Sequence, residues 1–415
     1  MNSLVSSLRL PLRRKERTHA TPLPLATRTA LDLLARLEGG ALQLHLPGIE
    51  TRTLGQGEPC AELLIHDLQL FDRVLTEGDI GFGEAYVDGD WDSTDLPALL
   101  TLLAENRQTL ARAVHGRWWA VVRHRMLHLA RSNTRGGSRR NILAHYDLGN
   151  EFYRLWLDPG MTYSAALFGS ATSMGLEQAQ RVKYHRLLDR LDPRPGDTIL
   201  EIGSGWGGFA EVAVQEYGCR VHGITLSPAQ LTFARERASV GGWADQAEFS
   251  LTDYRDVQRN GRQYDHIVSI EMFEAVGERF WSGYFKQLKR LLRPGGRAAI
   301  QTITIANERF SAYRRGTDFI QRHIFPGGML PSPAVFESRA ASADFLVTER
   351  FAFGPDYAKT LALWHQRFEA AWPQISAQGF DERFHRLWRF YLAYCEAGFR
   401  AGATDVYHYL LEKRR

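Results

Sequence analysis

The 415-residue chain is 44% hydrophobic and 24% charged with a formal net charge of +4, the composition of an ordinary folded protein of two or three domains. It has no apolar run near the roughly 18 residues that a membrane-spanning helix needs, and residues 1–17 lack the apolar core of a secretory signal. Cys60, Cys219 and Cys395 lie far apart, which argues against a disulfide framework, predicts no metal site and favours a reducing cytoplasm.

The first part of the chain is predicted to be a basic arm followed by a small α+β domain. Residues 1–24 mix Arg, Pro and Ser and are expected to be flexible. The domain, residues 25–130, shows helix and strand patterns in turn: a helix at 31–37, strands at 42–46 and 61–65, and a helix at 95–110. Asp95 has the side chain to cap the start of that last helix.

A cationic region ends this domain and leads into the rest of the chain. Residues 115–130 interleave Trp, Val, Met and Leu with Arg and His, the pattern of a basic amphipathic helix. Such a helix can lie on a bilayer or pack on a neighbouring domain, and we favour packing. Residues 131–140, with Arg135, Arg139 and Arg140, form a basic linker that is either solvated chain or attracted to an anionic lipid surface.

From about residue 141 the chain alternates short apolar strands with helices, which predicts a mostly parallel sheet covered on both faces. The expected strands are 198–202, 220–224, 247–252, 266–269 and 298–304, and the expected helices include 228–238 and 280–292. The last hundred residues are expected to be helical and aromatic, with Trp364, Phe368 and Trp372 four apart. This stripe is either plain core or the wall of a long apolar tunnel.

A glycine-rich turn follows the first strand of this sheet. Gly203, Gly205, Gly207 and Gly208 lie between the apolar strand at 198–202 and a helical pattern. A strand that turns through glycines into a helix brings bare backbone N–H groups up to a ligand. Because nucleotide-like cofactors bind at such turns, at the carboxyl ends of parallel strands, we expect a cofactor of this kind here.

Polar side chains after the next two strands narrow the choice of cofactor. A dinucleotide enzyme places an acidic residue after the second strand, whereas this chain has Thr225 and Gln230 there. This difference argues against NAD and favours a ligand held by neutral hydrogen-bonding groups. After the third strand, Asp253 could accept from an exocyclic amine and Tyr254 could stack on a base.

Two carboxylates, Glu271 and Glu274, directly follow the fourth strand. Burying an unpaired carboxylate costs several kcal/mol, and such groups are retained where they act on a ligand. The position next to the predicted cofactor turn therefore predicts that one of these glutamates faces a ligand.

Eight segments in the second part of the chain form an ordered set of motifs. They are 145–150 (HYDLGN), 161–164 (MTYS), 201–208, 223–230, 253–256 (DYRD), 272–277 (MFEAVG), 323–328 (HIFPGG) and 353–357 (FGPDY). Together they resemble the cyclopropane-fatty-acyl-phospholipid synthase family, a branch of the S-adenosylmethionine (SAM) methyltransferases. The resemblance implies a Rossmann-like catalytic domain at 141–415 with a seven-stranded sheet, beside the smaller N-terminal α+β domain. It also implies SAM as the cofactor and a cis double bond in a phospholipid acyl chain as the methyl acceptor.

The resemblance assigns contacts to SAM residue by residue. The implied SAM-binding residues are Tyr163, Ser164, Glu201, Gly203, Gly205, Thr225, Gln230, Asp253 and Tyr254. The two glycines would lie under the methionine portion, and the residues at 163 and 164 would close on the same ligand. The threonine and the glutamine would hold the ribose, and the aspartate with the tyrosine after it would hold the adenine.

The same resemblance implies how the carbocation formed by methylation loses a proton. In the family that step is assigned to a bicarbonate ion held by a Cys, a Glu, a His, a Tyr and a backbone group. Glu274, Tyr357 and the backbone of Ile303 match this set. Ala165 stands in place of the cysteine, and Gln301 stands in place of the histidine. Because alanine donates nothing and glutamine cannot titrate, the product is either a cyclopropane or, as we favour, a methylated and still unsaturated chain.

Two other functions fit parts of the sequence. One is methylation of a nitrogen or oxygen atom in a small molecule, which would need a compact polar pocket. The other is lipid binding by a homologue that keeps the fold without turnover. The resemblance favours a cytoplasmic enzyme at the inner face of the cell membrane that acts on unsaturated phospholipids. It suggests a homodimer and gives no reason to expect a nucleic-acid partner.

Overall fold

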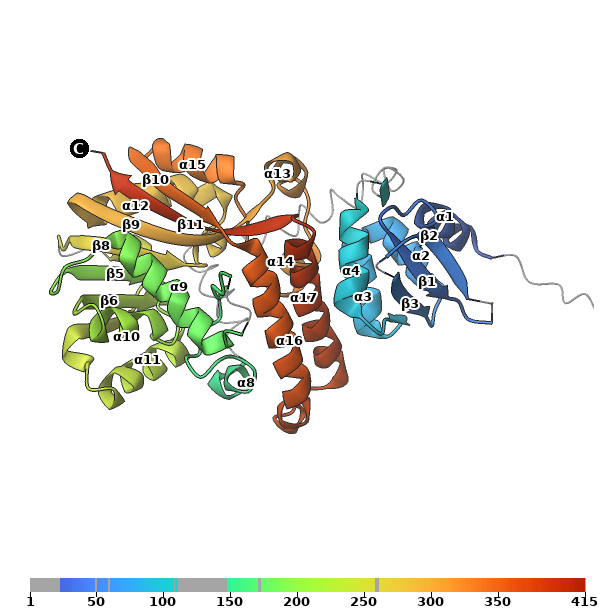
Figure 1. Ribbon diagram of the computed structural model, residues 1–415, viewed down its shortest axis with the longest axis horizontal. Helices are drawn as coiled ribbons and strands as arrows, with labels where there is room; N and C mark the ends of the chain where they lie inside the picture. The colour runs from blue at the N-terminus through green and yellow to red at the C-terminus, as the bar shows by residue number, and fades with distance from the viewer. Residues whose placement is uncertain are drawn as a thin grey trace, which may run out of the picture.

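The computed structural model describes residues 23–48, 51–58, 60–107, 109–110, 148–170, 173–257 and 261–414. These residues form a small N-terminal domain, blue to cyan in Figure 1, and a larger domain built on a seven-stranded sheet. The arm up to residue 22, the segment 115–130, the linker 131–140, and His145 with Tyr146 lie outside the described residues. No described helix combines the length and apolar content that a membrane span requires.

The small domain has the predicted α+β character, with strands in the order β2-β1-β3-β4. The strands are β1 (Gly40–His45), β2 (Arg52–Gln56), β3 (Cys60–Ile65) and β4 (Trp91–Asp92), and the helices are α1 (Leu25–Leu34), α2 (Gln69–Glu77), α3 (Asp79–Asp88) and α4 (Leu96–Glu105). Leu42 and Leu44, two residues apart on β1, are fully buried, as the period of a strand dictates. Asp95 accepts a hydrogen bond from the Ala98 N–H and caps α4, which confirms that prediction.

The main sheet has the strand order β10-β11-β9-β8-β5-β6-β7. Its strands are β5 (Thr198–Ile202), β6 (Arg220–Thr225), β7 (Ala247–Leu251), β8 (Tyr264–Ile270), β9 (Leu292–Ile305), β10 (Phe345–Ala352) and β11 (Thr404–Lys413). Neighbours among β5 to β9 pair in parallel, and β11 pairs antiparallel with β9 and with β10. The expected seven-stranded, mostly parallel sheet is therefore confirmed.

Helices cover both faces of this sheet (Figure 1). The helices α9 (Leu176–Leu191), α10 (Gly208–Gln215) and α11 (Pro228–Val240) share one apolar cluster, and α12 (Trp281–Leu291) and α15 (Pro333–Ala341) share another. Successive residues of β5 belong to different clusters, Ile199 to the first and Leu200 to the second. This alternation places the two apolar layers on opposite faces of the sheet.

The C-terminal hundred residues contain the expected aromatic helices and, in addition, two strands whose positions were not predicted. The helices α16 (Gly354–Ala377) and α17 (Glu382–Arg400) do form, and in Figure 1 they lie between the main sheet and the small domain. The strands β10 and β11 flank them and extend the sheet beyond β9. The described part of this domain also contains three further short α-helices: α8 (Asn150–Arg154), α13 (Asn307–Tyr313) and α14 (Phe319–His323).

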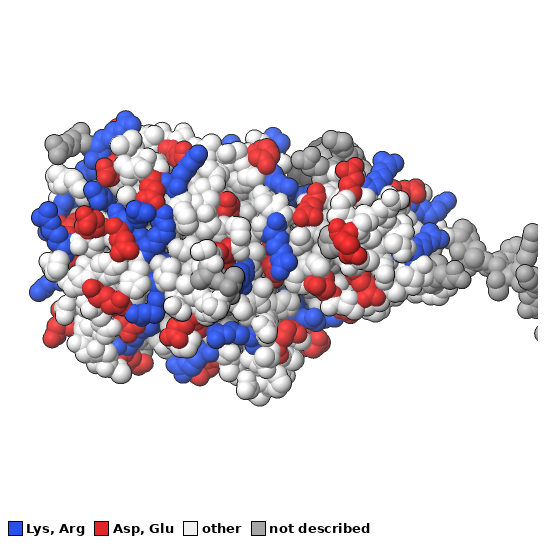
Figure 2. Space-filling view, viewed as in Figure 1, with Lys and Arg blue, Asp and Glu red and all other residues white. Residues whose placement is uncertain are grey.

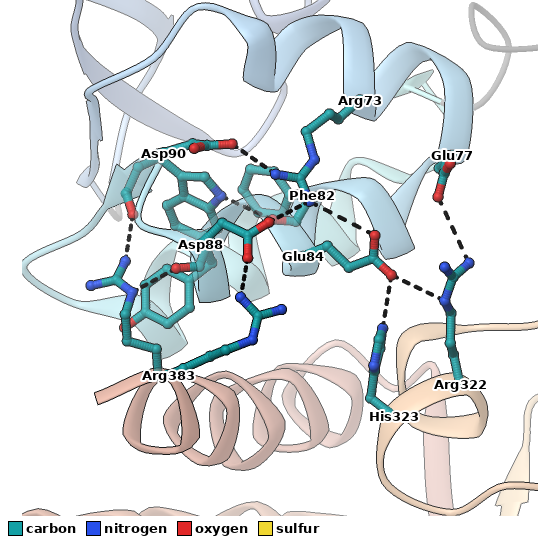
Figure 3. A network of polar contacts seen from close by, with 12 residues as sticks. Arg73, Glu77, Phe82, Glu84, Asp88, Asp90, Arg322, His323 and Arg383 are labelled. Carbon is teal, nitrogen blue, oxygen red and sulfur yellow. Dashed lines mark hydrogen bonds and ion pairs between the residues drawn. The ribbon is translucent and has the colours of Figure 1, made fainter. Parts of the chain in front are cut away.

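Ion pairs join the small domain to the larger one (Figure 3). Glu84 on α3 accepts from Arg322 Nε and from His323 Nε2 of α14, each at 3.0 Å. Arg383 on α17 pairs with Asp88 at the end of α3. The helix α3 is therefore fixed against two helices, α14 and α17, that also line the cavity described next.

Candidate active site

A cavity of about 350 Å³ lies where the carboxyl ends of β5, β6 and β8 face α14, α16 and α17. It collects most of the residues that the sequence predicted for the site. Of those, the lining contains Tyr163, Ser164, Glu201, Gly203, Gly205, Thr225, Gln230, Tyr254, Glu274, Ile303 and Tyr357. Ala165, Gln301 and Asp253 are not part of the lining.

The glycine turn at one end of the cavity, Gly203 to Gly207, has a backbone conformation suited to holding a ligand, and we call it the glycine cradle. Gly203, Gly205 and Gly207 have φ angles of 86°, 51° and 85°, in the region that favours glycine. A β-carbon at Gly203 would lie 3.2 Å from Met272 Cγ, so this position is also closely packed. Because α10 begins directly after the turn, its N-terminal N–H groups point toward the same end of the cavity.

Two polar atoms at this end are buried without a hydrogen-bond partner among the described residues. They are Glu201 Oε2, at the end of β5, and Ser204 Oγ in the turn. Burial raises the pKa of Glu201 well above its usual value, against the opposing charges of Lys183 and Arg237. A cationic, hydrogen-bonding ligand would satisfy both atoms. The residues of this end of the cavity therefore fit a cofactor with an amino acid portion, as SAM has.

The residues expected to bind the ribose and the adenine differ in their hydrogen-bond partners within the protein. Thr225 Oγ1 donates to Gln230 Oε1 at 2.9 Å, so the two side chains form one unit on the cavity wall. Tyr254 also lines the cavity. The Asp253 carboxylate instead pairs with Arg255, whose Nε lies 2.8 Å from Oδ1. The adenine contact of Asp253 remains a prediction.

Lys183 is a buried cation that sequence reasoning missed. Its Nζ donates to Ser164 Oγ and to Gln180 Oε1, each at 2.7 Å. Burial lowers the pKa of Lys183 to about 7, although Glu271, Asp158 and Glu201 oppose the shift. Lys183 lies on the buried face of α9, and only the three-dimensional arrangement identifies it as support for Ser164.

The two carboxylate oxygens of Glu274 differ in their hydrogen bonding. Its Oε1 accepts from the Ile303 backbone N–H and from the Thr302 hydroxyl, the latter at 3.1 Å. Its Oε2 is buried and has no hydrogen-bond partner among the described residues. Burial and the nearby Glu271 raise the pKa of Glu274 to about 8. The prediction that a glutamate of this pair faces the ligand space agrees with its place in the lining.

Glu271 is held by three hydrogen-bond donors. Its Oε1 accepts from the Ala165 backbone N–H at 2.8 Å and from Gln301 Nε2 at 2.7 Å. Its Oε2 accepts from the Tyr357 hydroxyl at 2.7 Å. Burial raises the pKa of Glu271, and these donors together with Lys183 oppose the rise. The residue has a positive φ of 49°, which is rare for a non-glycine residue and typical of functional positions.

The residues expected to hold bicarbonate do not fit that ion. Tyr357, Gln301 and the backbone at Ala165 all donate to the Glu271 carboxylate. The backbone N–H of Ile303 donates to Glu274. A protein carboxylate therefore takes the donors that a bound anion would need. Sequence reasoning singled out the positions at 165 and 301 but did not foresee that Glu271 fills the space between them.

One part of the cavity wall is apolar. It includes Leu361 of α16 and the rings of Tyr391 and Phe399 of α17. The Tyr391 hydroxyl lies 2.7 Å from the Tyr163 hydroxyl, which joins this wall to the loop over the cofactor end. Trp364 is instead fully buried in the core, so the tunnel interpretation of the aromatic stripe is wrong for that residue.

Comparisons with known proteins give consistent matches. A family model described as "Mycolic acid cyclopropane synthetase" matches residues 134–409. A tuberculostearic acid methyltransferase of Mycobacterium tuberculosis is 39% identical over 400 residues, which cover 94% of this chain and 92% of that protein. The cyclopropane-fatty-acyl-phospholipid synthase of Escherichia coli is 34% identical over 359 residues, which cover 86% of this chain and 89% of that protein.

Solved structures agree with these sequence matches. A cyclopropane synthase from Mycobacterium tuberculosis superposes with a TM-score of 0.62 at 31% identity, over 66% of this chain and 98% of that chain. A mycolic acid cyclopropane synthase solved with SAH and CTAB superposes with a TM-score of 0.61 at 33% identity, over 66% of this chain and 98% of that chain.

Proposed function

This chain belongs to the mycolic acid cyclopropane synthetase family of SAM-dependent methyltransferases, and we propose that it methylates the cis double bond of an unsaturated phospholipid acyl chain. The observation that carries the proposal is the pair of carboxylates, Glu271 and Glu274, which line the same cavity as the glycine cradle and the apolar side chains of α16 and α17. We further propose that the product stays acyclic and keeps one carbon–carbon double bond.

The proposed reaction needs alignment and exclusion of water, because an alkene is a weak nucleophile. SAM supplies an electrophilic methyl group on a positively charged sulfur. The cradle at Gly203 and Gly205 and the unsatisfied Glu201 and Ser204 would hold its amino acid portion. The bond between the Tyr163 and Tyr391 hydroxyls ties the loop above the cavity to α17, which limits the entry of water.

The two glutamates would stabilise the positive charge that methylation leaves on the acyl chain. Glu271, fixed by three donors, offers a negative charge at a set position. Glu274 Oε2 has no competing hydrogen bond among the described residues and would accept the proton. A cationic cofactor lowers the pKa of Glu274 from about 8 and so favours the ionised form. Loss of the proton from the carbocation then forms the new double bond.

The acyclic product follows from where the base lies. Closing a ring requires that the new methyl group itself lose a proton while it bonds to the second alkene carbon. In the family a bicarbonate ion is assigned this role, and here the Glu271 carboxylate takes its donors. The proton acceptor we propose is Glu274, whose other oxygen is held by the Ile303 backbone N–H. Because this carboxylate is fixed to the chain and cannot move within the cavity as an ion can, we expect proton removal from another carbon or after a hydride shift.

We place the enzyme at the cytoplasmic face of the membrane, where its phospholipid substrate lies. On the face drawn in Figure 2, acidic and basic side chains of the described residues are interspersed over both domains. We therefore propose that the basic residues of 131–140 provide the attraction to anionic lipid. The family resemblance also supports a homodimer through the N-terminal domain.

The direct test is turnover of SAM on phospholipid vesicles. Vesicles with cis-unsaturated chains should yield acyl chains heavier by one CH₂ unit, and vesicles with saturated chains should yield none. A small-molecule methyltransferase would leave both lipids unchanged. SAM binding without a lipid product would instead identify a homologue that keeps the fold without turnover, and would contradict the proposal.

A further inference from the structure

His408 lies next to Gln301 on the neighbouring strand and is not part of the cavity lining. The two residues are directly opposite in the register of β11 and β9, and both are buried. His408 Nε2 is 2.8 Å from Gln301 Oε1. Gln301 Nε2 in turn donates to Glu271 Oε1 at 2.7 Å. A continuous hydrogen-bonded chain therefore links an interior strand to the carboxylate of the site.

The partners of His408 determine its tautomer. Arg186 of α9 places Nη1 3.4 Å from Nδ1, and because a guanidinium can only donate, Nδ1 must accept. The proton then lies on Nε2, where it meets the amide oxygen of Gln301. Arg186 is itself held over the Phe351 ring, 3.9 Å from its centroid, and by Glu349 of β10. Burial and the charges of Arg186 and Lys183 lower the pKa of His408, so the ring stays neutral.

A fixed imidazole donor also fixes the orientation of the Gln301 amide. The amide oxygen faces His408, so the amide nitrogen must face Glu271. If the amide rotated by half a turn, its oxygen would meet the Glu271 carboxylate, with one donor lost and two acceptors in contact. We propose that His408 is a positioning residue that holds Gln301, and through it the Glu271 carboxylate, in the arrangement needed for methyl transfer. This inference rests on the proposed function.

The test compares two substitutions in the full-length enzyme. Glutamine in His408→Gln can donate to Gln301 and accept from Arg186, whereas leucine in His408→Leu can do neither. We expect His408→Leu to lower kcat on unsaturated phospholipid vesicles at least tenfold, with unchanged KM and SAM affinity. We expect His408→Gln to keep most of the kcat of the parent enzyme. Without His408 the Gln301 amide is no longer held with its nitrogen toward Glu271, and loss of that donor raises the pKa of Glu271. The acid limb of the pH profile of kcat should therefore move to higher pH in His408→Leu only.

A matched control is His266→Leu. His266 is another buried imidazole, but it lies near the start of β8, whereas Glu271 follows the end of that strand, so its loss should leave the pH profile of kcat unchanged. A folded His408→Leu enzyme with normal kcat, or a His408→Gln enzyme as impaired as His408→Leu, would overturn the inference. A readout without turnover separates this from failure of the proposed function. Imidazole ¹H–¹⁵N NMR should find the His408 proton on Nε2, and a proton on Nδ1 would refute the inference.

Discussion

Glu271 is the residue that most distinguishes this site, because it combines backbone strain with a carboxylate that accepts from three donors. Its φ of 49° costs a non-glycine residue on the order of 1 kcal/mol, and glycine would avoid that cost. The Ala165 N–H, Gln301 and Tyr357 all point at its oxygens. The strain is therefore consistent with a carboxylate that is needed at this place.

Replacing Glu271 by glycine tests that interpretation. Glu271→Gly should remain folded, since removal of the positive-φ cost offsets part of the loss of its three hydrogen bonds. Turnover should fall by about 10² to 10³, as when a preorganised electrostatic group is lost. Added bicarbonate should restore part of the activity by binding the three freed donors. Full activity without added anion would remove Glu271 from the mechanism.

Glu274 predicts a pH dependence of SAM binding. Its pKa of about 8 means that it is mostly protonated at neutral pH, and a sulfonium ligand favours the ionised form. Affinity for SAM should therefore rise with pH up to about 8 and then level, with proton release below that pH. Calorimetry in buffers of different ionisation enthalpy measures this release.

SAH, which lacks the sulfonium charge, is the control ligand for that experiment and should release fewer protons. In Glu274→Gln, SAM should still bind, without the extra proton release, while turnover is lost. Normal turnover in Glu274→Gln would exclude this residue as the proton acceptor.

At the scale of elements, the parallel strands were predictable because their signals are local. The run at 198–202 is apolar, short and followed by glycines, and β5 has those same bounds. The strand β11 was not predicted, because its stability comes from pairing with β9, as in the contact of Val406 with Ile303, about a hundred residues away. The hydrogen bond between His408 and Gln301 could not be predicted for the same reason, because the two residues meet only when these strands pair.

The residues of the site also divide into those that the local sequence predicts and those that it does not. The glycine turn and Glu274 could be inferred from residues next to strand ends. The fit of Glu271 between Ala165 and Gln301 could not, because three separate segments meet there only in the folded chain. For Asp253 the structure adds a partner that the sequence did not predict, Arg255, while its contact with a ligand stays a prediction.

Close packing between β6 and the glycine turn supports the cofactor end of the cavity. A β-carbon at Gly223 would lie 2.6 Å from Phe249 and 2.9 Å from Ser204 Cβ. Gly223→Ala should therefore lower the free energy of unfolding by about 1–3 kcal/mol and weaken SAM binding. Gly283→Ala, at a helical position with open space, should be neutral or stabilising by up to about 1 kcal/mol. Equal effects in denaturant unfolding would contradict this packing argument.

At the scale of the whole molecule, the seam between the domains is held by charged side chains around Glu84 (Figure 3). A hydrogen bond from His323, and the charge of Arg322, lower the pKa of Glu84 despite burial. A carboxyl with a lowered pKa stabilises the fold above its ordinary value near 4.5 and loses that effect as pH falls through its folded pKa.

Glu84→Gln should therefore destabilise the protein at pH 7 by about 1 kcal/mol, since the pair is partly exposed. The difference in melting temperature should shrink as the pH falls below 4.5. Glu308→Gln, at an exposed position of α13, is a matched control and should have no effect. A difference that grows in acid would contradict the assigned sign.

The central proposal is that this site methylates an alkene without closing a ring. Mass spectrometry of the acyl chains, after reaction with SAM labelled by deuterium in its methyl group and again after mild hydrogenation, tests it most directly. We predict a product that takes up two hydrogens on hydrogenation. Three retained deuteriums would indicate a methyl-branched alkene, and two would indicate an exocyclic methylene. A product with two deuteriums that takes up no hydrogen would be a cyclopropane and would contradict the claim.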